Sequence, residues 1–161
     1  MAKKPYNIFI SHYAKDDKHV QSLKDRLNNS GTIVRNFSVD STKHKDGRRP
    51  SDRVITRLLN IRIKACSTFI CLIGPDTHTR KWVNYEIRKA FQEGKRVIGI
   101  YTHGNKDSAI LPEPMKKYGA SVLGWNSLDK LGDVIEGKKS IFENQDGTTA
   151  TPYYKIERIC N

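Results

Sequence analysis

Two short stretches, far apart in the sequence, carry side chains that could do chemistry together. Ser11, His12 and Tyr13 make up the first stretch, and Trp82, Asn84 and Glu86 belong to the second. Together they offer one carboxylate beside hydroxyl and amide groups, with aromatic rings available for stacking. This combination suits cleavage of a glycosidic bond to a nucleobase or to a pyridinium ring.

The carboxylate of Glu86 is the group on which this interpretation depends. Nicotinamide in NAD is already a cationic leaving group and needs no acid in order to leave. A single carboxylate can therefore hold the ribose hydroxyls and stabilise the oxocarbenium-like charge as it forms. From spacing alone, the alternative stays open that Glu86 is only a solvated residue at the border of a helix.

The second stretch opens an amphipathic segment, residues 81–91, that is expected to be a helix. Its apolar stripe consists of Val83, Ile87, Ala90 and Phe91. At about 100° per residue, Glu86 falls about 60° from Val83, at one border of this stripe, and Asn84 lies at the opposite border. We expect the Glu86 carboxylate to lie half in the core and half in a cleft.

Strand-like and helix-like segments alternate along the chain. Strands are expected at residues 6–11, 32–39, 68–73, 96–101 and 121–125. The alternation predicts an α/β protein with a three-layer, flavodoxin-like fold, whose central, mostly parallel sheet has about five strands in the order 2-1-3-4-5. The switch point of such a sheet lies between the first and third strands, so both chemical stretches would border one crevice.

The segment after Ser51 is expected to be a helix that packs against the sheet. Val54, Ile55, Leu58 and Leu59 are predicted to form its buried face. Farther along, Ile61 and Ile63 make the helix apolar on more than one side, which indicates either a partner contact or a broad core face.

The length and charge of the chain indicate how many domains it has and which kinds of partner it could bind. With 161 residues, we expect one domain, with a core at about residues 5–136 and a C-terminal extension at residues 137–161. The 29 lysines and arginines exceed the 17 aspartates and glutamates, and the net charge of +12 favours an anionic partner. Because these basic residues are spread along the chain, a solvated surface is favoured over a nucleic-acid interface.

The three cysteines indicate the compartment. Cys66, Cys71 and Cys160 are odd in number and lack a C-x-x-C spacing, so buried thiols in a reducing environment are expected. No apolar run has the length of a signal peptide or of a membrane span. We therefore expect a cytoplasmic protein with no membrane partner.

Several other kinds of site lack their signatures. There is no G-x-G-x-x-G after a strand, no G-x-x-x-x-G-K-[ST], no H-E-x-x-H and no G-x-S-x-G. These absences argue against dinucleotide-dependent dehydrogenases, P-loop NTPases, zincins and α/β-hydrolases. The histidines show no ligand-like spacing with the cysteines, so neither a metal ion nor a bound cofactor is expected.

The two stretches resemble the two motifs of a known domain family. Ile8 through Tyr13, followed by Asp16 and Asp17, is similar to the first-strand motif of TIR domains. The segment at residues 80–87 is similar to their helix motif, with a tryptophan four residues before a glutamate. In combination they resemble the bacterial TIR-like proteins typified by the TIR component of the Thoeris anti-phage system, over about residues 5–125.

This resemblance implies a TIR-type fold and an enzyme that cleaves its substrate NAD at the nicotinamide–ribose bond. In Thoeris members the product is a cyclic ADP-ribose-type nucleotide that activates a separate effector protein. The family's catalytic glutamate falls on Glu86. By the same resemblance, the candidates for contact with the substrate are Phe9, Ser11, His12, Tyr13, Trp82 and Asn84. For Phe9 and Trp82, packing in the core is an equally open interpretation.

Two other functions stay open. A non-catalytic TIR-like module would act by protein contact through the loop between Asp40 and Pro50, which TIR domains use for self-association or for gating the site. The basic residues of that loop, Arg48 and Arg49, could face a pyrophosphate or a neighbouring subunit. A nucleoside deoxyribosyltransferase-like enzyme, with a related α/β fold, would use the glutamate as a nucleophile.

Overall fold

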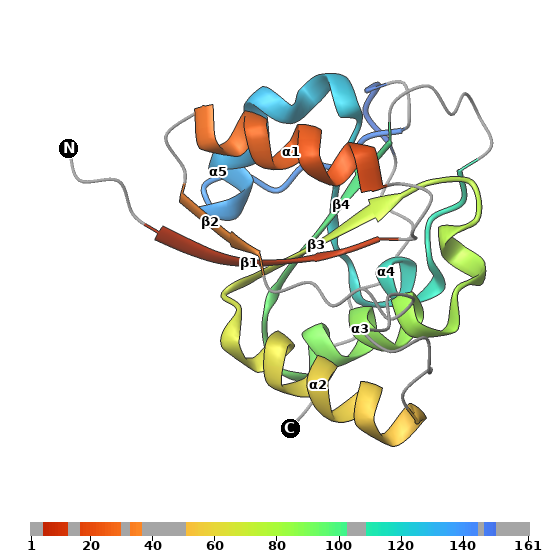
Figure 1. Cartoon of the computed structure of the whole chain (residues 1–161). Helices are drawn as coiled ribbons and strands as arrows, with labels where there is room; N and C mark the ends of the chain where they lie inside the picture. Colours follow the sequence, from red (N-terminus) through yellow and green to blue (C-terminus); the bar gives the residue numbers. More distant parts are fainter. Residues whose placement is uncertain are drawn as a thin grey trace.

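Five parallel strands form the central sheet of the protein (Figure 1). In this computed structural model, the described residues are 5–12, 17–29, 33–36, 51–102, 109–144 and 147–150. The strands are β1 (Pro5–Ser11), β2 (Ile33–Asn36), β3 (Thr68–Ile73), β4 (Arg96–Tyr101) and β5 (Ser121–Leu123). Their order in space is β2-β1-β3-β4-β5, as expected from the sequence. The predicted α/β class is confirmed.

Helices cover both faces of this sheet (Figure 1). One face carries α1 (Asp17–Asn29) and α5 (Leu131–Ile135), the latter preceded by the 3₁₀ helix η3 (Trp125–Lys130). The other face carries α2 (Asp52–Ala65), α3 (Lys81–Gln92) and α4 (Glu113–Tyr118). A short 3₁₀ turn, η2 (Thr77–Thr79), links β3 to α3. The chain thus forms three layers, helices on sheet on helices.

The alternation of side chains along β1 divides them between the two helical layers. Ile8 and Ile10 belong to the core cluster that includes α1 and α5. Phe9 belongs to the cluster formed with α2 and α3, and Ser11, two residues later, points to the same face. This parity turns the last side chain of β1 toward α3.

The core confirms the buried character of the third strand. All six residues of β3 are buried, as expected for a central parallel strand covered on both faces. Cys66 and Cys71 are buried free thiols, and burial raises the pKa of the Cys66 thiol. Cys160 lies outside the described residues.

The outer face of α2 differs from the prediction. Ile55, Leu59 and Ile63 form its buried face, whereas Val54 is 48% exposed and Leu58 is 41% exposed. The assignment of Val54 and Leu58 to the core was wrong. A helix that is apolar on two sides can meet the sheet with only one of them, and the packing selects the side of Ile63.

The end of the chain holds two further differences. The last strand stops at Leu123, and Trp125 begins η3 instead of continuing the strand, so the last helical segment is a 3₁₀ helix followed by a short α-helix. Part of the C-terminal extension pairs with β5. Phe142 lies beside Val122 in a parallel bridge, and Val122 N–H donates to Ile141 O at 2.8 Å.

Some expectations fall outside the described part of the chain. These are the end of the second strand at residues 37–39, the loop at residues 40–50, and the tail at residues 151–161. In the described part, no helix is both long enough and apolar enough to cross a membrane.

Candidate active site

The switch point of the sheet lies where β1 and β3 run side by side. Ser11, the last residue of β1, is in register with Cys71 of β3. From there β3 continues to Ile73, and the chain passes through η2 into α3. The carboxyl ends of both strands and the first turns of α3 therefore meet at one edge of the sheet, where open α/β proteins place their ligand sites.

Glu86 faces this edge from the second turn of α3. Its side chain points inward with Val83, Ile87 and Ala90, and Glu86 is only 6% exposed. Glu86 was expected to be half-exposed at the border of the helix, and that prediction was wrong: the residue is buried, because the end of β1 covers the carboxyl group. The Ser11 hydroxyl, itself 2% exposed, donates a hydrogen bond to Glu86 Oε2.

The apolar surroundings change the acidity of this carboxyl group. Burial raises the pKa of Glu86 to about 8, and the hydrogen bond from Ser11 counteracts that rise only in part. At neutral pH the free protein therefore holds Glu86 mostly in its protonated form. A buried carboxyl group with a strongly shifted pKa at a ligand-binding edge is a candidate for a functional role.

Asn84 has a clear structural task. Its Nδ2 donates to the backbone carbonyl oxygens of His78 at 3.0 Å and Arg80 at 3.1 Å. These bonds tie the first turn of α3 to the turn that precedes it. The Asn84 side chain, predicted to contact the substrate, thus holds the loop that delivers α3.

Thr77 is a positioning residue that the sequence analysis missed. It is fully buried, and its Oγ1 accepts a hydrogen bond from Gly74 N–H at 2.8 Å. The bond closes the turn directly after β3. A threonine three residues after Gly74, in the Gly-Pro pair that follows the strand, is a signal for such a turn that can be read in the sequence.

Trp82 and Tyr85 occupy the side of α3 that faces α2. Their rings meet edge to face, with centroids 5.8 Å apart, and Lys81 Nζ lies 5.3 Å from the centre of the Trp82 ring. The Tyr85 hydroxyl donates to Asn60 Oδ1 of α2 at 2.7 Å. Trp82 is half-buried, packs against the core cluster on this face of the sheet, and keeps an exposed part.

The remaining candidates lie on or beyond β1. Phe9 is 1% exposed and stacks on Phe69, with ring centroids 5.3 Å apart, so it is a core residue on the same face as Ser11. His12 is half-buried directly after the strand, with Nδ1 3.5 Å from Ile10 O. Tyr13 lies outside the described residues. The structure therefore brings Ser11 and Glu86 together and places Phe9 in the core on the same face of the sheet.

These groups define what the site can do. A carboxyl group shielded from water interacts strongly with a nearby cation, because electrostatic attraction is weakly screened in apolar surroundings. Within the described part of the chain, no group of three or more His, Cys, Asp or Glu side chains could hold a metal ion. The arrangement suits stabilisation of a positive charge that develops on a substrate.

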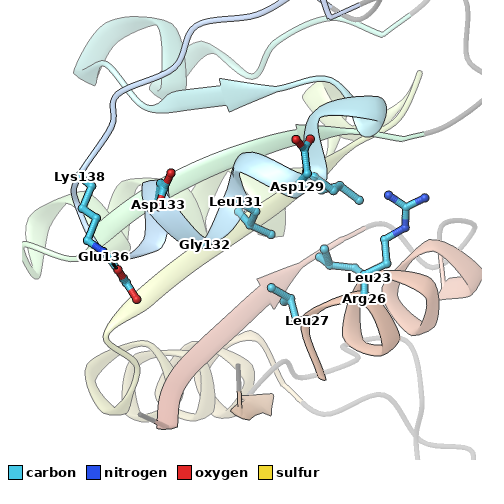
Figure 2. Close-up of a pocket in the computed structure, with 10 residues that line it drawn as sticks. Leu23, Arg26, Leu27, Asp129, Leu131, Gly132, Asp133, Glu136 and Lys138 are labelled. Carbon is cyan, nitrogen blue, oxygen red and sulfur yellow. Dashed lines mark ion pairs between the residues drawn. The ribbon is translucent and has the colours of Figure 1, made fainter. Parts of the chain in front are cut away.

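A separate groove of about 600 Å³ lies on the opposite face of the sheet, between α1 and the segment η3–α5 (Figure 2). Leu23 and Leu27 of α1 and Leu131 of α5 line its apolar part, and Arg26 and Asp133 are among its charged residues. None of the residues that line this groove comes from β1 or α3. The groove is therefore distinct from the Ser11–Glu86 site.

Solved structures with a similar arrangement include TIR domains. The TIR domain of the Toll-related receptor TRR-2 from Hydra magnipapillata matches with a TM-score of 0.54 and 13% identity, over 83% of this chain and 94% of that one. The CMP N-glycosidase BcmB from Clostridium botulinum matches with a TM-score of 0.50 and 20% identity, over 78% of this chain and 97% of that one. At these identities the likeness concerns the fold.

Similarity in sequence is more specific. A protein of Bacillus cereus (strain MSX-D12), described as "Putative cyclic ADP-D-ribose synthase ThsB1", is 32% identical over 139 residues. The match covers 82% of this chain and 64% of that protein, so the chain spans somewhat less than two thirds of the relative's length. The family model for the TIR-like domain of the Thoeris protein ThsB matches residues 9–107, which include Ser11 and Glu86. The chain therefore belongs to the ThsB TIR-like domain family.

Proposed function

We propose that this chain cleaves NAD at the nicotinamide–ribose bond and joins the remaining ADP-ribose into a cyclic nucleotide, with Glu86 as the catalytic residue. Membership of the ThsB family and the 32% identity to a protein described as a cyclic ADP-D-ribose synthase support the reaction type. The buried Glu86 carboxyl group, which accepts a hydrogen bond from Ser11 at the switch point, is the observation that carries the proposal.

The first chemical step breaks the bond between ribose C1′ and the nicotinamide nitrogen. The bonding electron pair leaves with nicotinamide, which becomes neutral, and positive charge develops on the ribose as an oxocarbenium-like species. The ionised Glu86 carboxylate stabilises that charge and accepts hydrogen bonds from the ribose hydroxyls. Because nicotinamide leaves as a neutral molecule, the site needs no second acid.

The second step decides between two products. Attack of water at C1′, with loss of one proton from that water to the solvent, gives ADP-ribose. Attack by a nucleophile of the same ADP-ribose molecule gives a cyclic product, and a hydroxyl nucleophile loses its proton in the same way. Apolar residues surround Glu86 on α3 and keep water from the reacting carbon. The burial of the carboxyl group therefore favours cyclisation over hydrolysis.

The other candidates have supporting roles in this proposal. Ser11 orients the Glu86 carboxylate, and Phe9 supports Ser11 from within the core. His12 and Tyr13 follow the end of β1 and contact the substrate, together with the exposed part of Trp82. Asn84 acts through the loop it holds.

The proposal extends to the setting of the reaction. The chain acts as a TIR-like domain in the cytoplasm, and its cyclic product diffuses to a separate effector protein in anti-phage defence. The loop at residues 40–50 serves self-association of the domain. The net charge of +12 is compatible with a dinucleotide substrate that carries a pyrophosphate.

The decisive experiment incubates the purified chain with NAD and follows nicotinamide release and cyclic product by chromatography. Glu86→Gln keeps the shape of the side chain but cannot ionise, so we expect turnover to fall by at least about 100-fold. Glu113→Gln, on the exposed surface of α4, is the matched control and should keep full activity. A second arm offers deoxynucleosides in place of NAD. Base exchange there, or unchanged NAD turnover in Glu86→Gln, would contradict the proposal.

A further inference from the structure

The side of α2 that points away from the sheet carries a continuous apolar stripe. Val54 is 48% exposed, Leu58 is 41% exposed and Ile61 is 56% exposed, and Ala65 at the end of the helix is exposed as well. The buried face of α2, which includes Leu59, already supplies the contact with the sheet. The stripe is therefore additional apolar surface and not part of the core.

The spacing of this stripe is that of a coiled-coil seam. Val54, Leu58, Ile61 and Ala65 are separated by four, three and four residues, the d-a-d-a spacing of a heptad repeat. At a rise of about 1.5 Å per residue, the stripe extends about 16 Å along the helix. A seam of this length and spacing fits the apolar edge of one partner helix.

Three exposed basic residues flank the seam. In the same heptad register, Arg57 and Lys64 occupy the g positions and Arg62 occupies an e position, and all are exposed. Among the described residues, none of these three side chains makes an ion pair shorter than 4.0 Å. Because e and g charges determine which helices pair, the flanks select a partner with acidic residues at the facing positions.

We propose that α2 docks an amphipathic helix of a partner protein, one with aliphatic residues along its seam and Glu or Asp at its flanks. A second copy of this chain does not fit. In a parallel pair Arg57 at a g position would face Arg62 at the following e position of the other copy, and in an antiparallel pair g positions would meet g positions, so both arrangements bring basic residues together.

An anionic membrane surface would also attract Arg57, Arg62 and Lys64, but the apolar residues fit it poorly. Helices that lie in a membrane interface typically insert aromatic or leucine-rich faces. Here the stripe holds no aromatic side chain, and its 4-3-4 spacing is that of a helix–helix seam. The proposal concerns a surface away from the Ser11–Glu86 pair and stands or falls independently of NAD cleavage.

The test uses the full chain and two fluorescein-labelled, helix-stapled peptides of three heptads, each with Leu and Ile at a and d. One carries Glu at every e and g position and the other carries Lys. By fluorescence anisotropy we expect the Glu peptide to bind at least about tenfold more tightly than the Lys peptide. That preference should shrink as sodium chloride rises from about 50 to 300 mM, because the flanking charges are exposed to solvent.

Two sets of variants assign the binding to α2. Leu58→Gln with Ile61→Gln should abolish binding of the Glu peptide, and since both residues are exposed the circular dichroism spectrum should not change. Arg57→Glu, Arg62→Glu and Lys64→Glu together should reverse the preference toward the Lys peptide. The matched control reverses Lys18, Arg88 and Lys117, exposed basic residues of α1, α3 and α4, and should keep the preference.

Four outcomes would overturn the proposal. The first is equal binding of both peptides, or none, by the unmodified chain. The second is an equal loss of binding in the control triple variant. The third is a dimer in sedimentation velocity that Leu58→Gln with Ile61→Gln dissolves. The last is a chain that binds phosphatidylserine vesicles through the same residues but does not bind the Glu peptide.

Discussion

Ser11 Oγ donates a hydrogen bond to the Glu86 carboxyl group, joining the end of β1 to the second turn of α3 across 75 positions of sequence. Both side chains are buried, so the bond lies in apolar surroundings. It couples the geometry of the switch point to the protonation state of one carboxyl group. Three measurable consequences follow for Glu86 and Ser11.

Replacing Glu86 by Gln should stabilise the protein, and the gain should grow with pH. Because the folded-state pKa of about 8 lies above the ordinary value of 4.5, the folded protein holds a proton that the unfolded chain releases. The stability supplied by that proton is fully present below about pH 4.5 and is lost as pH rises to about 8. The free energy of unfolding of Glu86→Gln should therefore exceed that of the unmodified protein by a margin that grows by about 1.4 kcal/mol per pH unit in this window.

Urea denaturation at intervals from pH 4 to pH 9 measures this difference. Glu113→Gln on the exposed surface of α4 serves as the control, and its free energy of unfolding should stay close to that of the unmodified protein at every pH. A constant difference for Glu86→Gln would mean that Glu86 is ionised and solvated in the folded protein. That result would contradict the burial seen in the structure.

The rate of NAD cleavage should rise with pH through the titration of Glu86. Only the ionised carboxylate stabilises the developing cation, so kcat/KM should increase from pH 6 to pH 9 with a midpoint near 8. Bound NAD brings a cationic ring into the site, which favours the ionised carboxylate. The midpoint of kcat should therefore lie below that of kcat/KM. A profile of kcat/KM that is flat over this range would contradict the assignment.

Ser11→Ala should lower kcat/KM for NAD more at neutral pH than at higher pH. The hydroxyl lowers the pKa of Glu86, so its removal raises that pKa further and moves the midpoint of kcat/KM to higher pH. We expect about a tenfold loss of kcat/KM at pH 7 and a smaller loss at pH 9. Ser22→Ala on the exposed side of α1, where the hydroxyl donates only to Lys18 O, is the matched control. An equal loss at every pH would indicate a structural role for Ser11 alone.

The sequence predicted the layout of the site better than its environment. The strand at residues 68–73 was readable because every position is apolar, and a fully buried central strand allows no alternation. The position of Glu86 on the helix followed from its angle to Val83. The angle of Glu86 around α3 does not indicate which element packs against that side of the helix. The end of β1 covers Glu86 only through a contact between residues far apart in the sequence.

Other features were hidden for the same physical reason. Val54 and Leu58 have the same apolar character as Ile55, and the choice of face depends on how α2 meets the sheet. Glu143 carries no local signal at all, because its hydrogen-bond partners lie 16 and 19 positions away. Patterns of period and angle report local structure, whereas burial depends on which elements meet.

Asn84→Asp separates a structural role from a substrate contact. The substitution keeps the shape of the side chain but replaces the amide donor that bonds His78 O and Arg80 O, and it places a carboxylate against two carbonyl oxygens. We expect a loss of about 1–3 kcal/mol in the free energy of unfolding, measured by urea denaturation. If the urea midpoint is unchanged and only KM for NAD rises, Asn84 contacts the substrate and does not hold the loop.

Glu143→Ala should release the C-terminal extension from the edge of the sheet. Glu143 is 6% exposed, and its two carboxylate oxygens accept from Gly124 N–H at 3.1 Å and from Ser127 Oγ at 3.0 Å. Without this acceptor, two buried donors lose their partner at the start of η3, at a cost of about 1–3 kcal/mol in stability.

Trypsin provides a local readout of that release, because Lys138 and Lys139 lie just before the segment that pairs with β5. In Glu143→Ala we expect faster cleavage at these two lysines. The cleavage rate of Glu143→Gln should fall between the rates of the unmodified protein and of Glu143→Ala, since the single acceptor oxygen of Gln can satisfy only one of the donors. Cleavage at an unchanged rate in Glu143→Ala would show that the backbone pairing at Val122 holds the extension without the carboxylate.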